Sequence, residues 1–222
     1  MSRYVASLLA CSLGLPIACK TPTTLTTGGA SKPAERGRTY AWSFDDIVAN
    51  GPATAFVPVL GEWKVQAEAT APSKPNVLRQ KGLFGGADFP RTIVRDLVFT
   101  DLTVSVRCRP ESGSTDRACG LMLRLKDSDN YYVTRANALE ANVRLYRVVD
   151  GDRQQLDSAS VGVSSGQWHT LEATARGTTL TVSWNGTQLL HWTDATFARG
   201  KIGLWTKADS VTAFDDLQAT AE

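Results

Sequence analysis

The sequence predicts one all-β domain built as a two-sheet antiparallel sandwich. From Thr39 onward, short runs rich in Val, Leu, Thr and aromatic residues recur about every ten residues, separated by turn signals. No segment sustains the 3.6-residue period of a helix. A length of 222 residues suits one sizeable core and is short for two independent enzyme domains.

The overall charge is almost balanced. Lys and Arg number 24 against 22 for Asp and Glu, which leaves a formal net charge of +2. A dedicated nucleic-acid binder carries a dense basic face, so nucleic acid is not an expected partner. Six Trp and five Tyr supply amphipathic rings, which either fill a core or offer flat faces to a ligand.

Residues 1–19 have the pattern of a secretory signal. Arg3 precedes an uncharged stretch rich in Leu and Ala that is too short to span a bilayer. Residues 15–19, Leu-Pro-Ile-Ala-Cys, are similar to a bacterial lipoprotein cleavage box, although Pro16 stands where Leu is usual. Lipidation of Cys19 and ordinary signal cleavage are the two alternatives. We expect an exported protein that is periplasmic, anchored to the outer membrane or extracellular, with a lipid anchor as its one membrane contact.

The signal is followed by a segment that cannot bury apolar surface. Residues 20–38 consist mainly of Thr, Gly, Ser, Pro and Lys, a composition typical of a disordered tether. We therefore place the folded domain at residues 39–222.

Two cysteines flank the short loop 109–118. In strand alternation, Cys108 shares a face with two Val residues and Cys119 with three Leu residues, so both thiols point toward the core. In an oxidising compartment we expect a disulfide that closes a hairpin, and two buried free thiols are the alternative. No His or further Cys lies near in sequence to suggest a metal site.

Two hairpins are marked by turn dipeptides. Asn185-Gly186 separates the runs 180–184 and 187–192, and Asn-Gly supplies the two positive φ angles of a type I′ turn. Asp150-Gly151 marks a second hairpin in the same way.

Several later stretches carry a family resemblance. These are 120–135, 143–151, 166–171 and 200–217, in that order along the chain. They resemble bacterial laminin-G-like domains of the concanavalin A-like lectin/glucanase superfamily, and the resemblance extends from about Tyr40 to the C-terminus. It implies a jelly-roll sandwich. Relatives of this kind are known as family 16 glycoside-hydrolase-like or 3-keto-disaccharide hydrolase domains, so the resemblance also implies carbohydrate as ligand or substrate.

The resemblance supplies no catalytic residue. Retaining glucanases of the superfamily place their carboxylates on alternate residues of one strand, whereas here Glu62, Glu68, Glu111, Glu140 and Glu172 stand singly. Glu140 is the candidate acid or base, because its loop joins two strands that carry arginines. Neither Gly-x-Ser-x-Gly nor His-Glu-x-x-His occurs.

Strand alternation predicts a ligand-binding patch on one sheet face. Guanidinium groups match carboxylates and hydroxyls, and aromatic rings offer apolar surfaces to pyranose rings. Such a patch suits a glycan, acidic ones included. The alternative is that the arginines pair with Asp127, Asp129 and Asp152 and that Trp205 is core. The predicted patch comprises Arg124, Tyr131, Arg135, Asn137, Arg144, Tyr146, Trp205 and Lys207.

The triplet Phe-Asp-Asp occurs near both ends of the domain, at 44–46 and 214–216. The resemblance implies that the first and last strands are neighbours, which would bring these acidic pairs together. Carboxylates are calcium ligands, so a structural calcium ion is one interpretation and two solvated turns are the other. The predicted ligands are Asp45, Asp46, Asp215 and Asp216.

Three functions fit these observations. The leading hypothesis is an exported module that recognises carbohydrate. The alternatives are a glycoside hydrolase of the 3-keto-disaccharide hydrolase-like group and a laminin-G-like protein-interaction domain.

Overall fold

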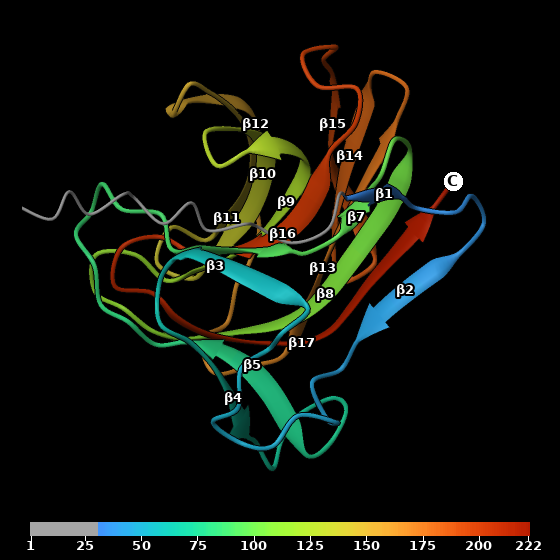
Figure 1. Cartoon of the computed structure of the whole chain (residues 1–222). Helices are drawn as coiled ribbons and strands as arrows, with labels where there is room; N and C mark the ends of the chain where they lie inside the picture. The colour runs from blue at the N-terminus through green and yellow to red at the C-terminus, as the bar shows by residue number, and fades with distance from the viewer. Residues whose placement is uncertain (1–30) are drawn as a thin grey trace, which may run out of the picture.

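The computed structural model describes residues 31–222, and all regular secondary structure among them is β-strand (Figure 1). Two large antiparallel sheets face each other as a jelly-roll sandwich of the concanavalin A-like kind, which confirms the predicted fold class. In this part of the chain, no helix has the length and apolarity needed to cross a membrane.

One sheet has seven strands. In spatial order they are β12 (Asp152–Ser160), β11 (Asn142–Val149), β10 (Asn130–Asn137), β9 (Ala118–Asp127), β16 (Lys201–Trp205), β6 (Arg91–Val94) and β3 (Phe56–Leu60).

The other sheet has eight strands. Seven follow the order β15 (Thr187–Thr193), β14 (Thr179–Trp184), β13 (His169–Arg176), β8 (Leu102–Ser112), β17 (Val211–Ala221), β5 (Asn76–Gln80) and β4 (Trp63–Ala67). The eighth, β2 (Thr39–Trp42), pairs with β17, so the first and last strands of the predicted domain are neighbours.

The main core fills the space between the sheets. In β8, Val104 and Val106 are fully buried while Thr103 and Ser105 are partly exposed, the alternation expected of a strand with one face on the core. Tyr132 and the other inward residues of the seven-stranded sheet pack against them in the same cluster.

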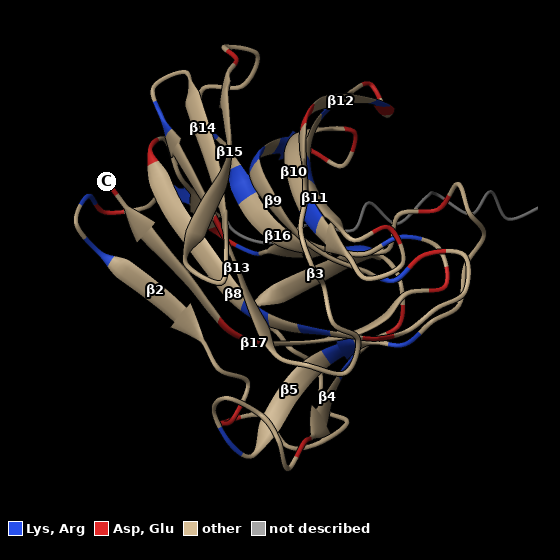
Figure 2. Cartoon of the chain, turned by 180° about the vertical axis from the view of Figure 1, so that it is seen from behind, with Lys and Arg blue, Asp and Glu red and all other residues tan. Residues whose placement is uncertain are grey.

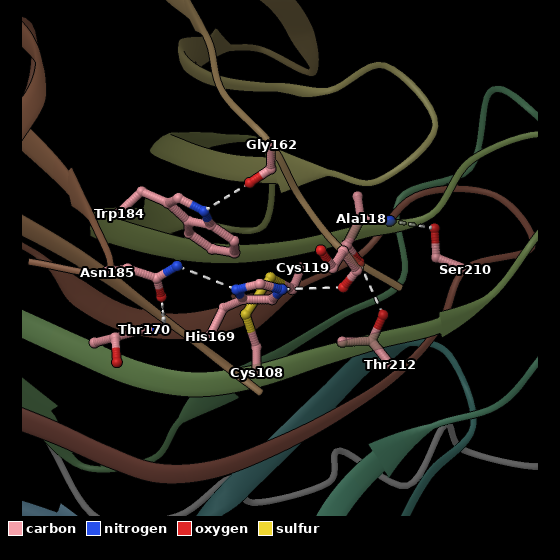
Figure 3. The surroundings of a disulfide bond; sticks show 11 residues. Cys108, Ala118, Cys119, Gly162, His169, Thr170, Trp184, Asn185, Ser210 and Thr212 are labelled. Carbon is pink, nitrogen blue, oxygen red and sulfur yellow. Dashed lines mark hydrogen bonds between the residues drawn. A yellow bond between two sulfur atoms is a disulfide. The ribbon is translucent and has the colours of Figure 1, made fainter. Parts of the chain in front are cut away.

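The predicted disulfide between Cys108 and Cys119 is present (Figure 3). Its position differs from the prediction, because β8 and β9 belong to different sheets and are not a hairpin. The bond, with Cα atoms 6.3 Å apart, therefore joins the two sheets through the core. Beside it the His169 ring stacks on Trp184 at 4.6 Å, a structural role in agreement with its burial.

Both predicted hairpins are confirmed. Asn185 and Gly186 have φ values of 50° and 83° and join β14 to β15. Asp150 and Gly151 have the same φ values and join β11 to β12. These are the left-handed conformations that a type I′ turn requires at both central positions.

The predicted tether overlaps the folded domain. Lys32–Pro33 forms β1, which pairs in parallel with β7 (Leu97–Val98). Gly37 N also donates to Ala221 O, so residues 31–38 are ordered against the sandwich. The predicted signal segment 1–19, Cys19 and the tether up to residue 30 lie outside the described residues.

Candidate functional site

The outer face of the seven-stranded sheet, which points away from the main core, carries a second cluster of aromatic side chains. Phe89, from the loop before β6, stacks on Trp205 of β16 with ring centroids 5.5 Å apart. The Arg153 guanidinium lies over the rings of Phe89 and Tyr146, at 4.7 and 4.5 Å from their centroids. Tyr131 belongs to the same cluster. Stacking and cation–π contacts thus hold these side chains together in one layer on the outer face.

The rings of this layer are not open platforms. Trp205 is fully buried, and Tyr131 and Tyr146 are only 2% and 4% exposed. Trp205 is therefore part of a core, as the alternative interpretation held. The groups that this face offers to a ligand are therefore polar side chains at the edge of the layer, and not ring faces.

Those polar groups form a cluster where β10 and β11 meet. Arg135 and Arg144 are opposite each other in the register of the two strands. The Glu140 carboxylate bridges them, 2.8 Å from Arg135 Nη2 and 3.0 Å from Arg144 Nη1. Arg135 also donates to the hydroxyl of Tyr146 at 3.2 Å and to the side-chain oxygen of Asn142. Three of the predicted patch residues and the candidate Glu140 are thus in one network.

A buried carboxylate extends the network toward β16. Asp116, in the loop before β9, is 1% exposed. It accepts hydrogen bonds from Asn137 Nδ2 at 2.8 Å and from Lys207 Nζ at 3.0 Å. Figure 2 shows Lys and Arg in blue and Asp and Glu in red along the ribbon, in the strands and in the loops. We call Asp116, Arg135, Asn137, Glu140, Asn142, Arg144 and Lys207 the polar cluster.

The two carboxylates of the polar cluster are shifted in opposite directions. Burial raises the pKa of Asp116 above its ordinary value, against the hydrogen bond and charge of Lys207. Burial also raises the pKa of Glu140, but the charge of Arg135 and hydrogen bonds from Asn142 and Arg135 outweigh it, so this pKa lies below its ordinary value. Glu140 is therefore ionised at neutral pH, and its side chain is 36% exposed.

Several guanidinium N–H groups of this face have no hydrogen-bond acceptor in the described chain. Arg135 and Arg144 pair with Glu140, and Lys207 pairs with Asp116. Arg153 lies over the aromatic rings. Arg135 Nε, Arg144 Nε and Arg153 Nη1 are buried, and each lacks a hydrogen-bond partner in the described chain. Buried donors of this kind are normally paired. The groups of the cluster that solvent reaches are the side chains of Arg144, Glu140 and Lys207, which are 32%, 36% and 22% exposed.

Arg124 was predicted to be part of the ligand-binding patch, but it is not part of the polar cluster. A bulge in β9 shifts its register with β10 between Leu123 and Asp127, and Arg124 has φ 47°. The alternation reverses there, so Leu125 joins the outer aromatic layer. Arg124 is 1% exposed and donates to the carbonyls of Thr100, Gly177 and Phe197 and to the carboxylate of Asp101. Its role is structural.

Sequence reasoning missed three members of the site. Arg153 is opposite Val148 in the β11–β12 register, so the Asp150-Gly151 turn could have placed it on the outer face. Phe89 and Asp116 lie in loops, where no periodicity assigns a side chain to a face. Arg135 and Arg144 pair with Glu140, and Arg124 pairs with Asp101. None of the three pairs with Asp127, Asp129 or Asp152, the partners that the alternative interpretation named.

The predicted calcium ligands are at the β2–β17 end of the eight-stranded sheet. Asp45 accepts a hydrogen bond from Asn76 N, and both oxygens of Asp215 are occupied by Ser73 at 2.9 Å. Among residues 31–222, no group of three or more His, Cys, Asp and Glu side chains is arranged to hold a metal ion. Calcium binding by Asp45, Asp46, Asp215 and Asp216 stays a prediction.

The model of a known family covers most of the chain. The 3-keto-alpha-glucoside-1,2-lyase-like domain matches residues 60–220, which include every residue of the polar cluster. The chain belongs to this family. The 3-keto-alpha-glucoside-1,2-lyase-like domain thus extends here from the end of β3 almost to the end of β17. No curated protein matches the chain.

Solved structures similar to this lyase-like domain share its fold at low sequence identity. The carbohydrate-binding module CBM66 from Bacillus subtilis is 16% identical with a TM-score of 0.63, covering 75% of this chain and 96% of its own. A Bacillus licheniformis beta-glucanase is 11% identical with a TM-score of 0.54, covering 85% of this chain and 100% of its own. A Bacillus subtilis protein of unknown function with a galectin-like fold is 13% identical with a TM-score of 0.57, covering 82% and 98%.

Proposed function

We propose that the polar cluster binds carbohydrate. One observation carries the proposal: Arg144, Glu140 and Lys207 are partly exposed at the edge of one sheet face, where they present hydrogen-bond donors and an acceptor to solvent. The hydroxyl oxygens of a sugar are suitable acceptors, and Glu140 accepts from hydroxyl donors. The similar fold of a carbohydrate-binding module supports the proposal.

The charge of the cluster favours acidic glycans. The cluster holds three cations and two carboxylates, so an added carboxylate is attracted to the partly exposed Arg144 and Lys207. An acidic oligosaccharide should therefore bind more tightly than its neutral counterpart. The difference should shrink as salt rises from low to about 1 M, because exposed charges are screened.

The test is binding of the full chain to an array of neutral and acidic glycans. Arg144→Gln removes one cation and one free donor, and affinity for the selected glycan should fall about tenfold. Arg176→Gln is the matched control, because Arg176 also pairs with one glutamate but belongs to β13 of the other sheet. Failure of every glycan to bind, or an equal effect of the two variants, would contradict the proposal and favour a protein partner.

A second candidate function is elimination from a 3-keto-glucoside. It is favoured by the family match and by the opposite pKa shifts of Asp116 and Glu140, since carboxylates whose surroundings move their pKa values apart are typical of acid–base sites. Ionised Glu140 would remove the C2 proton next to the 3-keto carbonyl. The C1–O bond would then break, a C1=C2 double bond would form, and the proton would end on the departing oxygen.

This activity has a direct assay. The full chain is incubated with a 3-keto-glucoside, and the conjugated ketone is followed by its ultraviolet absorbance. Glu140→Gln should abolish turnover, and Arg176→Gln should leave turnover unchanged. Absence of turnover with all 3-keto-glucosides would leave binding as the function of the cluster.

We also propose that the protein is exported. The signal pattern of residues 1–19 and the disulfide support this, because disulfides persist in oxidising compartments. The mass of the mature N-terminus distinguishes the two cleavage modes. A lipid-modified Cys19 that is lost in Cys19→Ser indicates an anchor, and an unmodified N-terminus indicates a freely released protein. A mature protein that retains Met1 would contradict export.

A further inference from the structure

A cavity opens at the other side of the sandwich, between the two edge strands. β3 ends the seven-stranded sheet and β4 ends the eight-stranded sheet. Between them, residues 50–58, β4, β5 and β6 enclose a cavity of about 380 Å³. This volume is within the range of small-molecule sites, roughly 300–1,000 Å³. None of the polar cluster residues lines it.

The inner wall of the cavity is apolar and fixed. Phe56 and Leu78 belong to the main core and are 4% and 1% exposed. The Trp63 indole Nε1 donates to Leu60 O at 2.9 Å, and its ring packs against Phe214 at 5.8 Å. The partly exposed Trp63 ring thus offers a preformed surface, which suits the C–H face of a sugar ring.

A buried hydroxyl of this cavity has no partner. Thr92 of β6 lines the cavity, is fully buried, and its Oγ1 makes no hydrogen bond within residues 31–222. An unpaired buried hydroxyl is destabilising, so its retention needs a reason. A ligand hydroxyl in the cavity would pair with it.

The cavity lining carries only positive charge. Lys64 and Arg95 are among its residues, and no Asp or Glu is. Neither cation forms an ion pair with a carboxylate of the described chain. Arg95 Nε donates to Thr54 O at 3.0 Å, which holds the guanidinium at this loop while its two Nη groups stay available. A planar guanidinium of this kind binds carboxylates through two parallel hydrogen bonds.

We propose that this cavity is a binding site for a uronic acid, a sugar ring that carries one carboxylate. The ring lies against Trp63, a ring hydroxyl pairs with Thr92, and the carboxylate faces Arg95 and Lys64. The site is separate from the polar cluster and does not depend on its proposed function.

Isothermal titration calorimetry of the full chain tests the proposal with three probes. Glucuronate should bind, glucose should bind at least about tenfold more weakly because it lacks the carboxylate, and benzoate should bind more weakly because it cannot pair with Thr92. Equal binding of glucose, tighter binding of benzoate or no heat with glucuronate would overturn the proposal.

Three variants locate the binding. Arg95→Gln should weaken glucuronate about tenfold, and Thr92→Val about fivefold with an unchanged or higher melting temperature, because it removes an unpaired polar group from the interior. Arg144→Gln in the polar cluster should have no effect on glucuronate. If Arg144→Gln weakens glucuronate while Arg95→Gln does not, the uronate binds at the polar cluster and the cavity proposal is wrong.

Discussion

Arg124 illustrates how one side chain can be buried with its charge satisfied. Its guanidinium reaches the carbonyls of Thr100, Gly177 and Phe197, at distances of 2.7–3.1 Å, and the Asp101 carboxylate at 3.0 Å. These partners come from three separate loops at one end of the sandwich. A single residue therefore ties loops that share no strand pairing.

Replacing this residue should be costly. Arg124→Met leaves three carbonyls without their donor in a buried site, so the free energy of unfolding should fall by about 3 kcal/mol. Urea denaturation measures the change. Arg144→Met is the control: its side chain is 32% exposed, and its loss should cost less than about 1 kcal/mol. Similar costs for the two variants would contradict the structural role of Arg124.

At the scale of strands, charged side chains connect β5 and β8 across β17. Arg79 of β5 and Arg109 of β8 are both opposite Ala213, whose small side chain leaves room between them. Glu68 and Glu111 bridge the two guanidinium groups, at 2.9 and 3.0 Å from Arg79 Nη2. The network fixes the β4–β5 edge of the eight-stranded sheet.

This network should make stability depend on pH. A hydrogen bond from Arg109 lowers the pKa of Glu68 from 4.5 to about 2. A lowered carboxyl pKa stabilises the fold above the unfolded value and loses this contribution as pH falls from 4.5 toward 2. At pH 7, Glu68→Gln should be about 2 kcal/mol less stable than the wild type, a gap that should close by about pH 2. Denaturation curves across this range measure the gap, and a gap that stays the same at every pH would contradict the role of Glu68.

The disulfide acts between sheets, so its removal should affect the whole core. Cys108 and Cys119 are separated by only 11 positions in the chain but belong to opposite sheets. The double variant Cys108→Ala, Cys119→Ala should lose about 2–3 kcal/mol in urea denaturation. In the wild type both sulfur-bearing residues are fully buried, so reductant should act only when denaturant is present. Rapid reduction under native conditions would contradict this burial.

Sequence patterns predicted the features that depend on neighbouring residues. Asn185-Gly186 marks its turn through its own backbone preference, and alternation placed Arg135, Asn137 and Tyr146 on one face, as observed. The pattern failed at Arg124, because a bulge reverses alternation and is set by pairing with another strand.

The remaining differences involve contacts distant in sequence. A short loop between two strands favours a hairpin, yet β8 and β9 pair with β17 and β10 instead. Asp116 joins the polar cluster only because Lys207 and Asn137 reach it. Nothing in the local sequence around these residues determines such partners.

For the whole molecule, the two proposed sites occupy different parts of the sandwich. The polar cluster lies where β10 and β11 meet, while the cavity lies between the edge strands β3 and β4. Each site concentrates positive charge although the chain has a net charge of only +2. Local arrangement, not overall charge, thus determines which ligands each surface attracts.

The N-terminal boundary of the folded unit can be tested at this scale. Lys32 N donates to Asp96 O at 2.9 Å and Ala34 N to Val98 O at 2.8 Å, while Gly37 N donates to Ala221 O at 2.7 Å. A chain that begins at residue 39 lacks these bonds and uncovers the core residues against which Ala34 packs. Its melting temperature should be about 5 °C lower than that of a chain beginning at residue 31. Equal melting temperatures would mean that residues 31–38 are a tether, as their composition predicts, and that the pairing of β1 with β7 contributes no stability.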